Sequence, residues 1–507
     1  MTKGRLYVGL DLGTSGLKGV ALAENGSVVA RAQATYPTRR PSSSAAEQNP
    51  ADWLRAAESV AADMAGQTEA KSWGGIGLSG MIPTLAVIDA SGHPDGPGIT
   101  WEDGRAERQG ERLRDLVGAE DLYRSTGQWL DGRYLLPMFQ RLAEEERPRA
   151  ERAAKICSAK DYLFSHLTGE LVTDPSTASG FGCFDLGDGA WRPALMAAAA
   201  ELLPIDLPGL PDVMPSTTTQ PLTKGAAEAI GVPAGLPVCL GAADSVLGAH
   251  GLGVDSEGEV AYVAGTSSVI LGVSSRLVFD KLHRYLVTPM LGEGSWGLEM
   301  DLLATGSALA WLASVLTGLR DAAAAGELAT RVAPEQAPVF LPYLGGGEQG
   351  ALWDPDLRGS VIGLELRHDG SHLARALLNG IVLESRRCLG VLEEAGLPAS
   401  EVHLTGGCAA VPGFDSDLAD ATGRRVSILP GGDTDASAAG AAMLAAQAID
   451  GLTIERAPET DDGKPARTVE PDEARREVWN RLFARHERAL AAVRHFRDDS
   501  PGKEETL

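Results

Sequence analysis

The stretch "YVGLDLGTSGLKGVALAENGSVVA", from Tyr7 to Ala30, carries the clearest structural signal in this sequence of 507 residues. Val8 and Leu10 are typical of a buried strand, which ends at Asp11 and runs into a Gly-Thr-Ser-Gly loop. Asn25-Gly26, between two apolar runs, is a strong signal for a tight hairpin turn. We therefore predict a strand, a short polar loop, a strand, a turn and a third strand. A P-loop is excluded, because its Gly-Lys-Ser/Thr would lead into a helix.

The bulk composition is that of an ordinary globular protein, with 44% hydrophobic and 22% charged residues. The length predicts two or more domains. The formal net charge is −24, and such an acidic surface repels nucleic-acid phosphates and anionic membranes. We therefore expect neither as a partner, although a local pocket for a small phosphorylated ligand stays compatible with this charge.

The cysteines and the apolar runs bear on the cellular compartment. The five cysteines are scattered and form no Cys-x-x-Cys pair, which favours reduced thiols over a disulfide framework or a zinc site. The first residues lack the apolar core of a signal peptide, and no run approaches the ~18 apolar residues of a membrane span. We expect a cytoplasmic protein that is not embedded in a membrane.

Ala-rich helical patterns alternate with short Val, Ile and Leu runs along most of the chain, which is the rhythm of an α/β protein. One G-x-G-x-x-G match, at Gly75–Gly80, leads into another apolar strand rather than a helix, so we discard a dinucleotide-binding site there. The expected elements are a helix at 50–70, strands within 74–94, a strand ending at 244 with a helix behind it, strand-loop-strand at 258–275, strand-turn-helix at 402–426, a helix within 431–449 and a final helix at 475–497.

The Gly-Thr-Ser loop occurs twice, once with Thr14 and once with Thr266, about half the chain length apart. Two similar α/β domains facing each other would bring both loops to one cleft. Loops rich in glycine and hydroxyls present donors that suit phosphate oxygens. Asp11 would then face the accompanying Mg²⁺, which prefers carboxylate, water and phosphate oxygens. The alternative, two unrelated turns at strand ends, stays open at this point.

Taken together, the motifs resemble those of the FGGY carbohydrate kinases, in the actin/hexokinase-like ATPase superfamily, with xylulokinase-like members the most similar. The resemblance runs in order from about residue 6 to residue 446. Its motifs are "GLDLGTSGLKGVAL", "GITWEDGRA", "SAKDYLFSHLTGELVTDPSTASG", "GAADSVLGAHGLG", "GTSS", "ATGSALAWL", "PYLGGGEQGALWDPDLRGSVIGL", "LLNGIVLESRR" and "LTGGCAAVPGF".

This resemblance implies an α/β fold with two actin/hexokinase-like (ribonuclease H-like) ATPase domains facing a central cleft. The implied limits are 1–246 for the N-terminal domain with the sugar site and the first phosphate loop, 247–455 for the nucleotide-binding C-terminal domain, and 456–507 for a charged linker and a C-terminal helix. The implied reaction is transfer of the γ-phosphate of ATP, with Mg²⁺, to a hydroxyl of a small sugar or polyol. A homodimer is common in the family and is a further expectation.

The resemblance also implies roles for single residues. Asp244 matches the catalytic base, although an aspartate at a strand end is also a common helix N-cap. Asp11 matches the residue facing the metal. Lys18 could instead be a solvated strand residue, and Gly306 and Gly407 could instead be plain turn glycines. The expected nucleotide-binding residues are Thr14, Ser15, Lys18, Gly265, Thr266, Ser267, Gly306 and Gly407.

The expected acceptor pocket departs from the xylulokinase pattern. Ile82, Pro83 and Thr84 stand where xylulokinases carry a Met-His-Gly, and Ser245 replaces the usual asparagine after the base. A ketopentose such as xylulose is the first expectation; alternatives are ribulose, erythritol, glycerol or gluconate, or a non-catalytic sugar-sensing protein, which the presence of both aspartates disfavours. The expected acceptor-site residues are Ile82, Pro83, Trp101, Asp103, Asp244 and Ser245.

Overall fold

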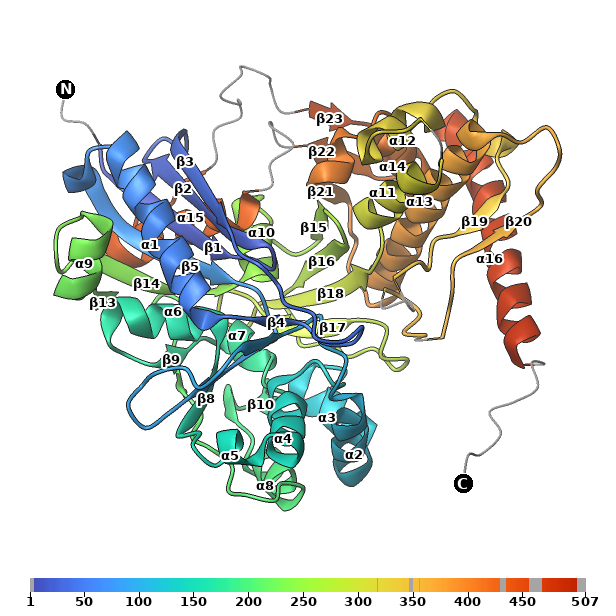
Figure 1. Cartoon of the computed structure of the whole chain (residues 1–507). Coiled ribbons are helices and arrows are strands. Elements are labelled where there is room, and N and C mark those ends of the chain that lie inside the picture. Colours follow the sequence, from blue (N-terminus) through green and yellow to red (C-terminus); the bar gives the residue numbers. More distant parts are fainter. Residues whose placement is uncertain are drawn as a thin grey trace.

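The computed structural model describes residues 4–316, 318–345, 350–354, 356–428, 435–455 and 467–498. Two lobes, each built around a mixed sheet, lie side by side, and a group of helices within residues 107–201 lies below the first lobe (Figure 1). The expected α/β fold with two actin/hexokinase-like domains is confirmed. The expected linker at 456–466, residues 346–349 and 355 of one motif, and the start of the stretch 431–449 lie outside the described residues.

The first sheet is built on the stretch that opens the sequence. β1 and β2 pair antiparallel around the Gly-Thr-Ser loop, and Gly26, with φ of 78°, makes the expected turn into β3. Its order is β13 (Thr219–Pro221), β14 (Pro237–Ala243), β5 (Trp73–Gly80), β1 (Leu6–Leu12), β2 (Gly16–Ala23), β3 (Val28–Thr35).

The second sheet repeats this plan around the second loop. Its order is β17 (Leu286–Pro289), β18 (Trp296–Leu302), β16 (Ser268–Ser274), β15 (Glu259–Ala264), β21 (Glu401–Thr405), β22 (Arg425–Ile428), β23 (Arg467–Val469). In each sheet a three-stranded antiparallel meander continues into two parallel strands: β3-β2-β1 into β5 and β14, and β18-β16-β15 into β21 and β22. The two Gly-Thr-Ser loops therefore hold equivalent positions, at the β1–β2 and β15–β16 connections.

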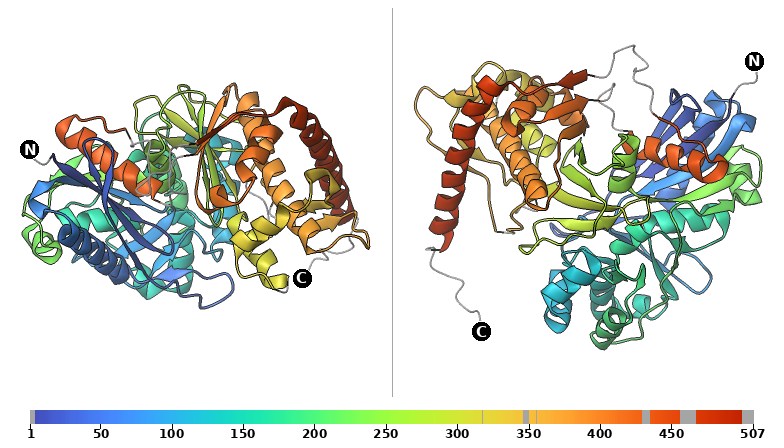
Figure 2. Two further views of the ribbon diagram at one scale, coloured as in Figure 1. Left: turned by 90° about the horizontal axis from the view of Figure 1, so that it is seen from above. Right: turned by 180° about the vertical axis from the view of Figure 1, so that it is seen from behind.

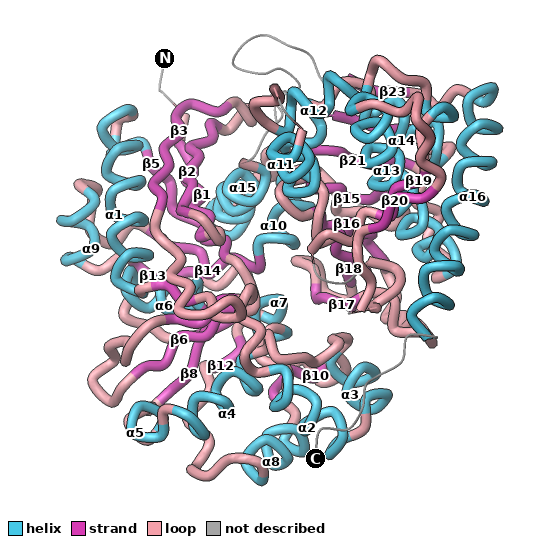
Figure 3. The backbone as a smooth tube through the Cα atoms, turned by 45° about the vertical axis from the view of Figure 1, so that its right-hand side comes forward, coloured by secondary structure: helices cyan, strands magenta, loops and turns pink. Residues whose placement is uncertain are grey.

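Helices cover the sheets on their outer faces and meet between them (Figure 3). The helix expected at 50–70 begins at Pro50, where the Asn49 side chain accepts a hydrogen bond from the Ala51 N–H. The helices are α1 (Pro50–Gln67), α6 (Ala159–Thr168), α7 (Pro175–Ser179), α9 (Lys224–Ile230), α10 (Asp244–Gly251), α11 (Gly306–Val315), α12 (Ala322–Ala329), α13 (Gly370–Glu394), α14 (Phe414–Thr422), α15 (Ala436–Asp450) and α16 (Glu473–Asp498).

The lower part of the first lobe is an insertion between β5 and β14. A small sheet in the order β4 (Glu47–Gln48), β7 (Gly98–Thr100), β6 (Thr84–Ile88), β8 (Lys155–Ser158) joins it to the main sheet. Its helices are α2 (Glu107–Val117), α3 (Ala119–Thr126), α4 (Leu135–Glu145), α5 (Arg147–Ala150) and α8 (Pro193–Glu201). The remaining short elements are β9 (Val172–Thr173), β10 (Phe184–Asp185), β11 (Ala190–Trp191), β12 (Asp212–Val213), β19 (Val339–Leu341), β20 (Ser360–Ile362) and the 3-10 turns 70–72, 334–336 and 407–410.

Late in the sequence, α15 returns to the first lobe and packs on β1 and β5 (Figure 2, right). Its crossing with α10 is so close that a Cβ on Gly440 would lie 2.0 Å from the Leu247 carbonyl oxygen, and one on Gly251 would lie 2.0 Å from that of Ala436. Only glycine allows this approach. The domain limits at 246 and 455 stay predictions, but the chain between them does not all belong to the second lobe.

Candidate active site

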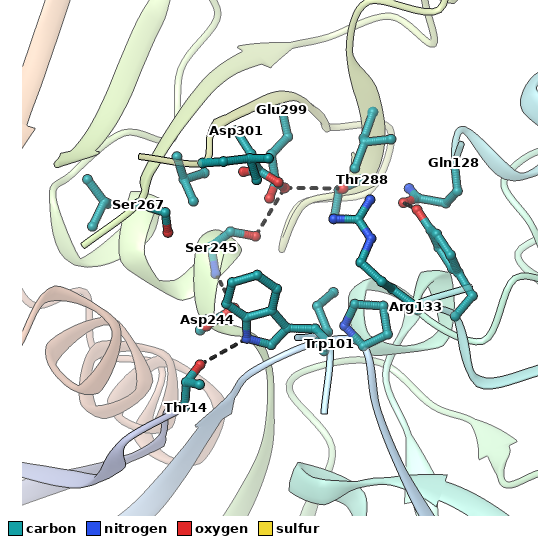
Figure 4. A pocket seen from close by; sticks show the side chains of 18 of the residues that line it. Thr14, Trp101, Gln128, Arg133, Asp244, Ser245, Ser267, Thr288, Glu299 and Asp301 are labelled. Carbon is teal, nitrogen blue, oxygen red and sulfur yellow. Dashed lines mark hydrogen bonds between the residues drawn. The ribbon is translucent and has the colours of Figure 1, made fainter. Parts of the chain in front are cut away.

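A cavity of about 260 Å³ lies between the two lobes and receives side chains from both. Ile82 and Pro83, just before β6, and Trp101, just after β7, line it from the first lobe, and β16 and β18 line it from the second. The lining includes Tyr134, Ser437 and ten further polar residues, which are labelled in Figure 4: Thr14, Trp101, Gln128, Arg133, Asp244, Ser245, Ser267, Thr288, Glu299 and Asp301.

The cavity brings together residues that the sequence predicted from three separate motifs. Thr14 of the first loop and Ser267 of the second both line it, together with Ile82 and Pro83 on its apolar side. The indole N–H of Trp101 donates to Thr14 Oγ1 over 2.9 Å (Figure 4). This bond links the expected acceptor pocket directly to the first Gly-Thr-Ser loop.

Asp244 stands at the end of β14 and is the first residue of α10. Its Oδ1 accepts a hydrogen bond from the adjacent Ser245 N–H over 3.0 Å, whereas the N-cap position belongs to Ala243 and has no side-chain cap. The plain capping role therefore does not explain this aspartate. Burial raises the pKa of Asp244 to about 8, and the negative charge of Asp11 contributes further.

Asp11 lies near the end of β1 and outside the cavity lining. Its negative charge acts on Asp244 and raises the pKa of that carboxyl. Ser79 Oγ donates to Asp11 Oδ1 over 2.7 Å, and Lys18 is its cross-strand partner on β2. Burial raises the pKa of Asp11, while the bond from Ser79 and the charge of Lys18 lower it. A desolvated carboxylate beside a second one is stabilised by a divalent cation, so its surroundings fit a Mg²⁺ ligand.

The second loop is buttressed by the start of α11. Gly306 N–H donates to the Gly265 carbonyl over 3.0 Å, and Ser307 N–H donates to that of Thr266, also over 3.0 Å. A Cβ on Gly306 would lie 2.5 Å from the Gly265 oxygen, and Gly306 has no positive φ, so close approach rather than a turn requires glycine there. At Gly407 a Cβ would meet nothing within 4 Å, so that face is open to a ligand.

Asp103 is one predicted acceptor-site residue that the structure keeps out of the cavity lining. Its carboxylate is buried, accepts the Ala46 N–H over 2.9 Å, and pairs with Arg105, which also bridges to Glu47. Asp103 therefore supports the loop beneath the pocket. The other predicted residues outside the lining are Asp11, Ser15, Lys18, Gly265, Thr266, Gly306 and Gly407.

The sequence analysis missed the acidic wall of the cavity. Glu299 and Asp301 lie two residues apart on β18 and therefore share one face of the strand. Glu299 Oε2 accepts hydrogen bonds from Ser245 Oγ over 3.1 Å and from Thr288 Oγ1 over 3.4 Å (Figure 4). The available signal was the pattern "LEMDL", in which acidic residues alternate with buried apolar ones.

Arg133, in the stretch "QWLDGRYLLP" at 128–137, was not predicted as a site residue either. Its Nε lies 3.0 Å from both carboxylate oxygens of Asp131, it lines the cavity, and its charge acts on Asp301. Burial raises the pKa of Glu299 to about 8, reinforced by Asp301 and Asp244. Burial also raises the pKa of Asp301, to about 6, against the opposing charge of Arg133.

Among the residues that the structure describes, no helix is both long enough and apolar enough to cross a membrane. Two family models match the chain: the N-terminal domain of the FGGY family of carbohydrate kinases over residues 6–251, and its C-terminal domain over residues 260–449.

Individual relatives agree with these matches. The chain is 30% identical to a xylulose kinase of Klebsiella pneumoniae over 491 residues, which are 95% of this chain and 99% of that protein. It is 29% identical to a gluconokinase of Bacillus subtilis (strain 168), over 79% of this chain and 80% of the relative. The crystal structure of xylulose kinase from Rhodospirillum rubrum superposes with a TM-score of 0.85 at 30% identity, covering 97% and 99% of the two chains. The chain thus belongs to the FGGY family of carbohydrate kinases and is a phosphotransferase that acts on an alcohol group of a sugar, with ATP as the family's phosphate donor.

Proposed function

We propose that this kinase transfers the γ-phosphate of ATP·Mg²⁺ to a hydroxyl of a ketopentose such as xylulose, with Asp244 as the catalytic base. The observation that carries the proposal is the position of Asp244 in a cavity whose lining also holds Thr14 and Ser267, one residue from each phosphate loop. Phosphoryl transfer requires mainly in-line positioning, charge neutralisation and a group that accepts the hydroxyl proton.

In this proposal the nucleotide phosphates lie against Thr14–Lys18 and Gly265–Ser267, between the lobes. The open face at Gly407 leaves room for the rest of the nucleotide, and the close contact of Gly306 with Gly265 fixes the second loop beside it. Asp11 holds Mg²⁺, which neutralises charge on the transferring phosphate when bound. The acceptor lies among Ile82, Pro83, Trp101, Ser245 and the acidic wall, and closure of the lobes excludes water. A homodimer and a cytoplasmic location stay predictions.

Xylulose is the first candidate acceptor because the Klebsiella relative and the Rhodospirillum structure, each 30% identical to this chain, are xylulose kinases. The gluconokinase relative keeps sugar acids as an alternative, and ribulose, erythritol and glycerol remain further candidates. The pocket itself differs from the xylulokinase pattern at Ile82, Pro83 and Ser245. A site built for a hydroxyl loses much discrimination when its polar partner is replaced.

The direct test is ADP release with ATP·Mg²⁺ against D-xylulose, D- and L-ribulose, xylitol, ribitol, erythritol, glycerol and gluconate. We expect D-xylulose to give the highest kcat/KM. A stronger response to another acceptor would replace xylulose but keep the transfer reaction. Bound ATP without turnover of any acceptor would contradict the proposed function.

We also expect an unusual pH dependence. A base must be deprotonated, and the pKa of Asp244 is raised to about 8, so kcat/KM for the acceptor should fall about tenfold per pH unit below that value. Asp301 is one of the charges that raise this pKa, so Asp301→Asn should move the acid limb to lower pH. A wild-type kcat/KM that stays constant between about pH 8 and about pH 6 would count against Asp244 as the base.

A further inference from the structure

Building on the proposed function, we infer that the acceptor is a neutral polyhydroxy compound, because Glu299 and Asp301 bind its hydroxyls and the negative charge of Asp301 repels sugar acids. The relatives leave the point open, because they include both a xylulose kinase and a gluconokinase. The distribution of charge around the cavity decides between the two classes of acceptor.

The acidic wall faces the reacting end of the cavity. Ser245, which follows the base directly, donates to Glu299 over 3.1 Å, so the carboxylate is linked to the first turn of α10. Asp301 lies on the same face of β18, opposite Val269 of β16, which also lines the cavity. A substrate that brings a hydroxyl to Asp244 must therefore place its neighbouring groups beside Glu299 and Asp301.

Arg133 is the arginine of the described cavity lining, and its charge is already matched within the protein. Asp131 accepts from its backbone N–H over 2.9 Å and from its guanidinium over 2.5–3.0 Å. The guanidinium and Asp301 also act on each other electrostatically. Arg133 therefore does not offer the unmatched cation that a substrate carboxylate would require.

The Gln128 side chain, another polar group of the lining, is also unavailable to a substrate carboxylate. The Gln128 side chain is occupied at both ends, because its amide donates to the Val287 carbonyl over 2.9 Å and its oxygen accepts from Tyr134 Oη over 3.0 Å. Carboxylates accept strong hydrogen bonds from hydroxyl groups. A carboxylate on the acceptor would instead meet the negative charge of Asp301 in a partly desolvated cavity, where like charges repel strongly.

The partial protonation of this wall suits a neutral acceptor as well. Burial raises the pKa of Glu299 to about 8, so near neutral pH its carboxyl spends much of its time protonated. In that form it donates one hydrogen bond and still accepts others. Glu299 can thus serve either a hydroxyl or a carbonyl oxygen of a sugar.

The test compares matched acceptors that differ only at one end: xylitol with xylonate, erythritol with erythronate, and glycerol with glycerate. For the wild-type enzyme we expect kcat/KM to favour the neutral member of each productive pair by about 100-fold or more. Glu299→Gln and Asp301→Asn should each lower kcat/KM for the neutral acceptor by about 10- to 100-fold. Asp301→Asn should also narrow the gap between the kcat/KM values of the two members at least tenfold, because it removes a negative charge, whereas Glu299→Gln should narrow that gap less.

Asp255→Asn provides the matched control, because Asp255 is 51% exposed and pairs with His250 away from the cavity lining. It should leave the preference unchanged. Equal use of the two members of a pair by the wild type, or an unchanged preference in Asp301→Asn, would overturn the inference. If no acceptor is phosphorylated, the proposed function fails, and the inference is then decided by binding: equal shifts in Tm with neutral and acidic acceptors, in the presence of ADP, would overturn it.

Discussion

Asp244→Asn is expected to lower kcat for acceptor phosphorylation by about 10²- to 10⁴-fold, the range typical of a lost general base. Asparagine keeps the size of the side chain and its acceptor oxygen, so the bond from the Ser245 N–H survives. It cannot take a proton from the attacking hydroxyl. The residual rate should also lose the acid limb that the raised pKa of Asp244 imposes on the wild type.

The measurement is steady-state ADP release with the best acceptor, together with calorimetric titration of ATP·Mg²⁺. The dissociation constant for ATP·Mg²⁺ should change little, because the phosphate loops are untouched. Asp255→Asn, which removes an exposed carboxylate paired with His250, should retain wild-type kcat. Near-normal turnover by Asp244→Asn would rule out the assignment of the base.

The second large effect on activity is expected from Asp11→Asn. We expect kcat/KM for ATP·Mg²⁺ to fall by about 100-fold or more, since a metal ion contributes several kcal/mol of charge stabilisation in the transition state. The variant should also need a higher Mg²⁺ concentration for half-maximal rate. Removing this charge lowers the pKa of Asp244 at the same time, so the base itself is not impaired.

The decisive readout for Asp11→Asn is the Mg²⁺ titration at saturating ATP, at a pH where the wild type is fully active. Ser79→Ala offers a graded control, because it removes the hydroxyl that donates to Asp11 over 2.7 Å but leaves the carboxylate. We expect a loss of tenfold or less from it. An unchanged Mg²⁺ requirement in Asp11→Asn would assign this aspartate to a purely structural role.

The first lobe was predictable in detail because its signals are local. The strand before Asp11, the Gly-Thr-Ser loop and the Asn25-Gly26 turn depend on neighbouring residues, and all form as expected. The same holds for α1, which the Asn49-Pro50 pair starts at the expected residue. The recurrence of the loop at Thr266 also indicated correctly that a second sheet follows the plan of the first.

The acidic wall was not predictable in the same way. Glu299 and Asp301 enter the cavity because β18 pairs with β16, and Arg133 enters it from the segment between α3 and α4. Asp103 shows the converse error, since its motif resembled a pocket motif but its carboxylate is consumed by Arg105 and the Ala46 N–H. Neighbouring residues in the sequence do not decide which polar groups pair inside the protein, because the possible partners come from distant segments.

By itself, the sequence determined the α/β fold, the two Gly-Thr-Ser loops and the aspartates at the ends of β1 and β14, because each follows from short-range backbone preferences or an ordered set of motifs. Only the tertiary structure decided that α15 returns to the first lobe, that Asp103 stays outside the cavity, and that Glu299 and Asp301 face Asp244. The physical reason is that burial and charge at a site depend on segments far apart in the chain, which meet only when the lobes pack around one cavity.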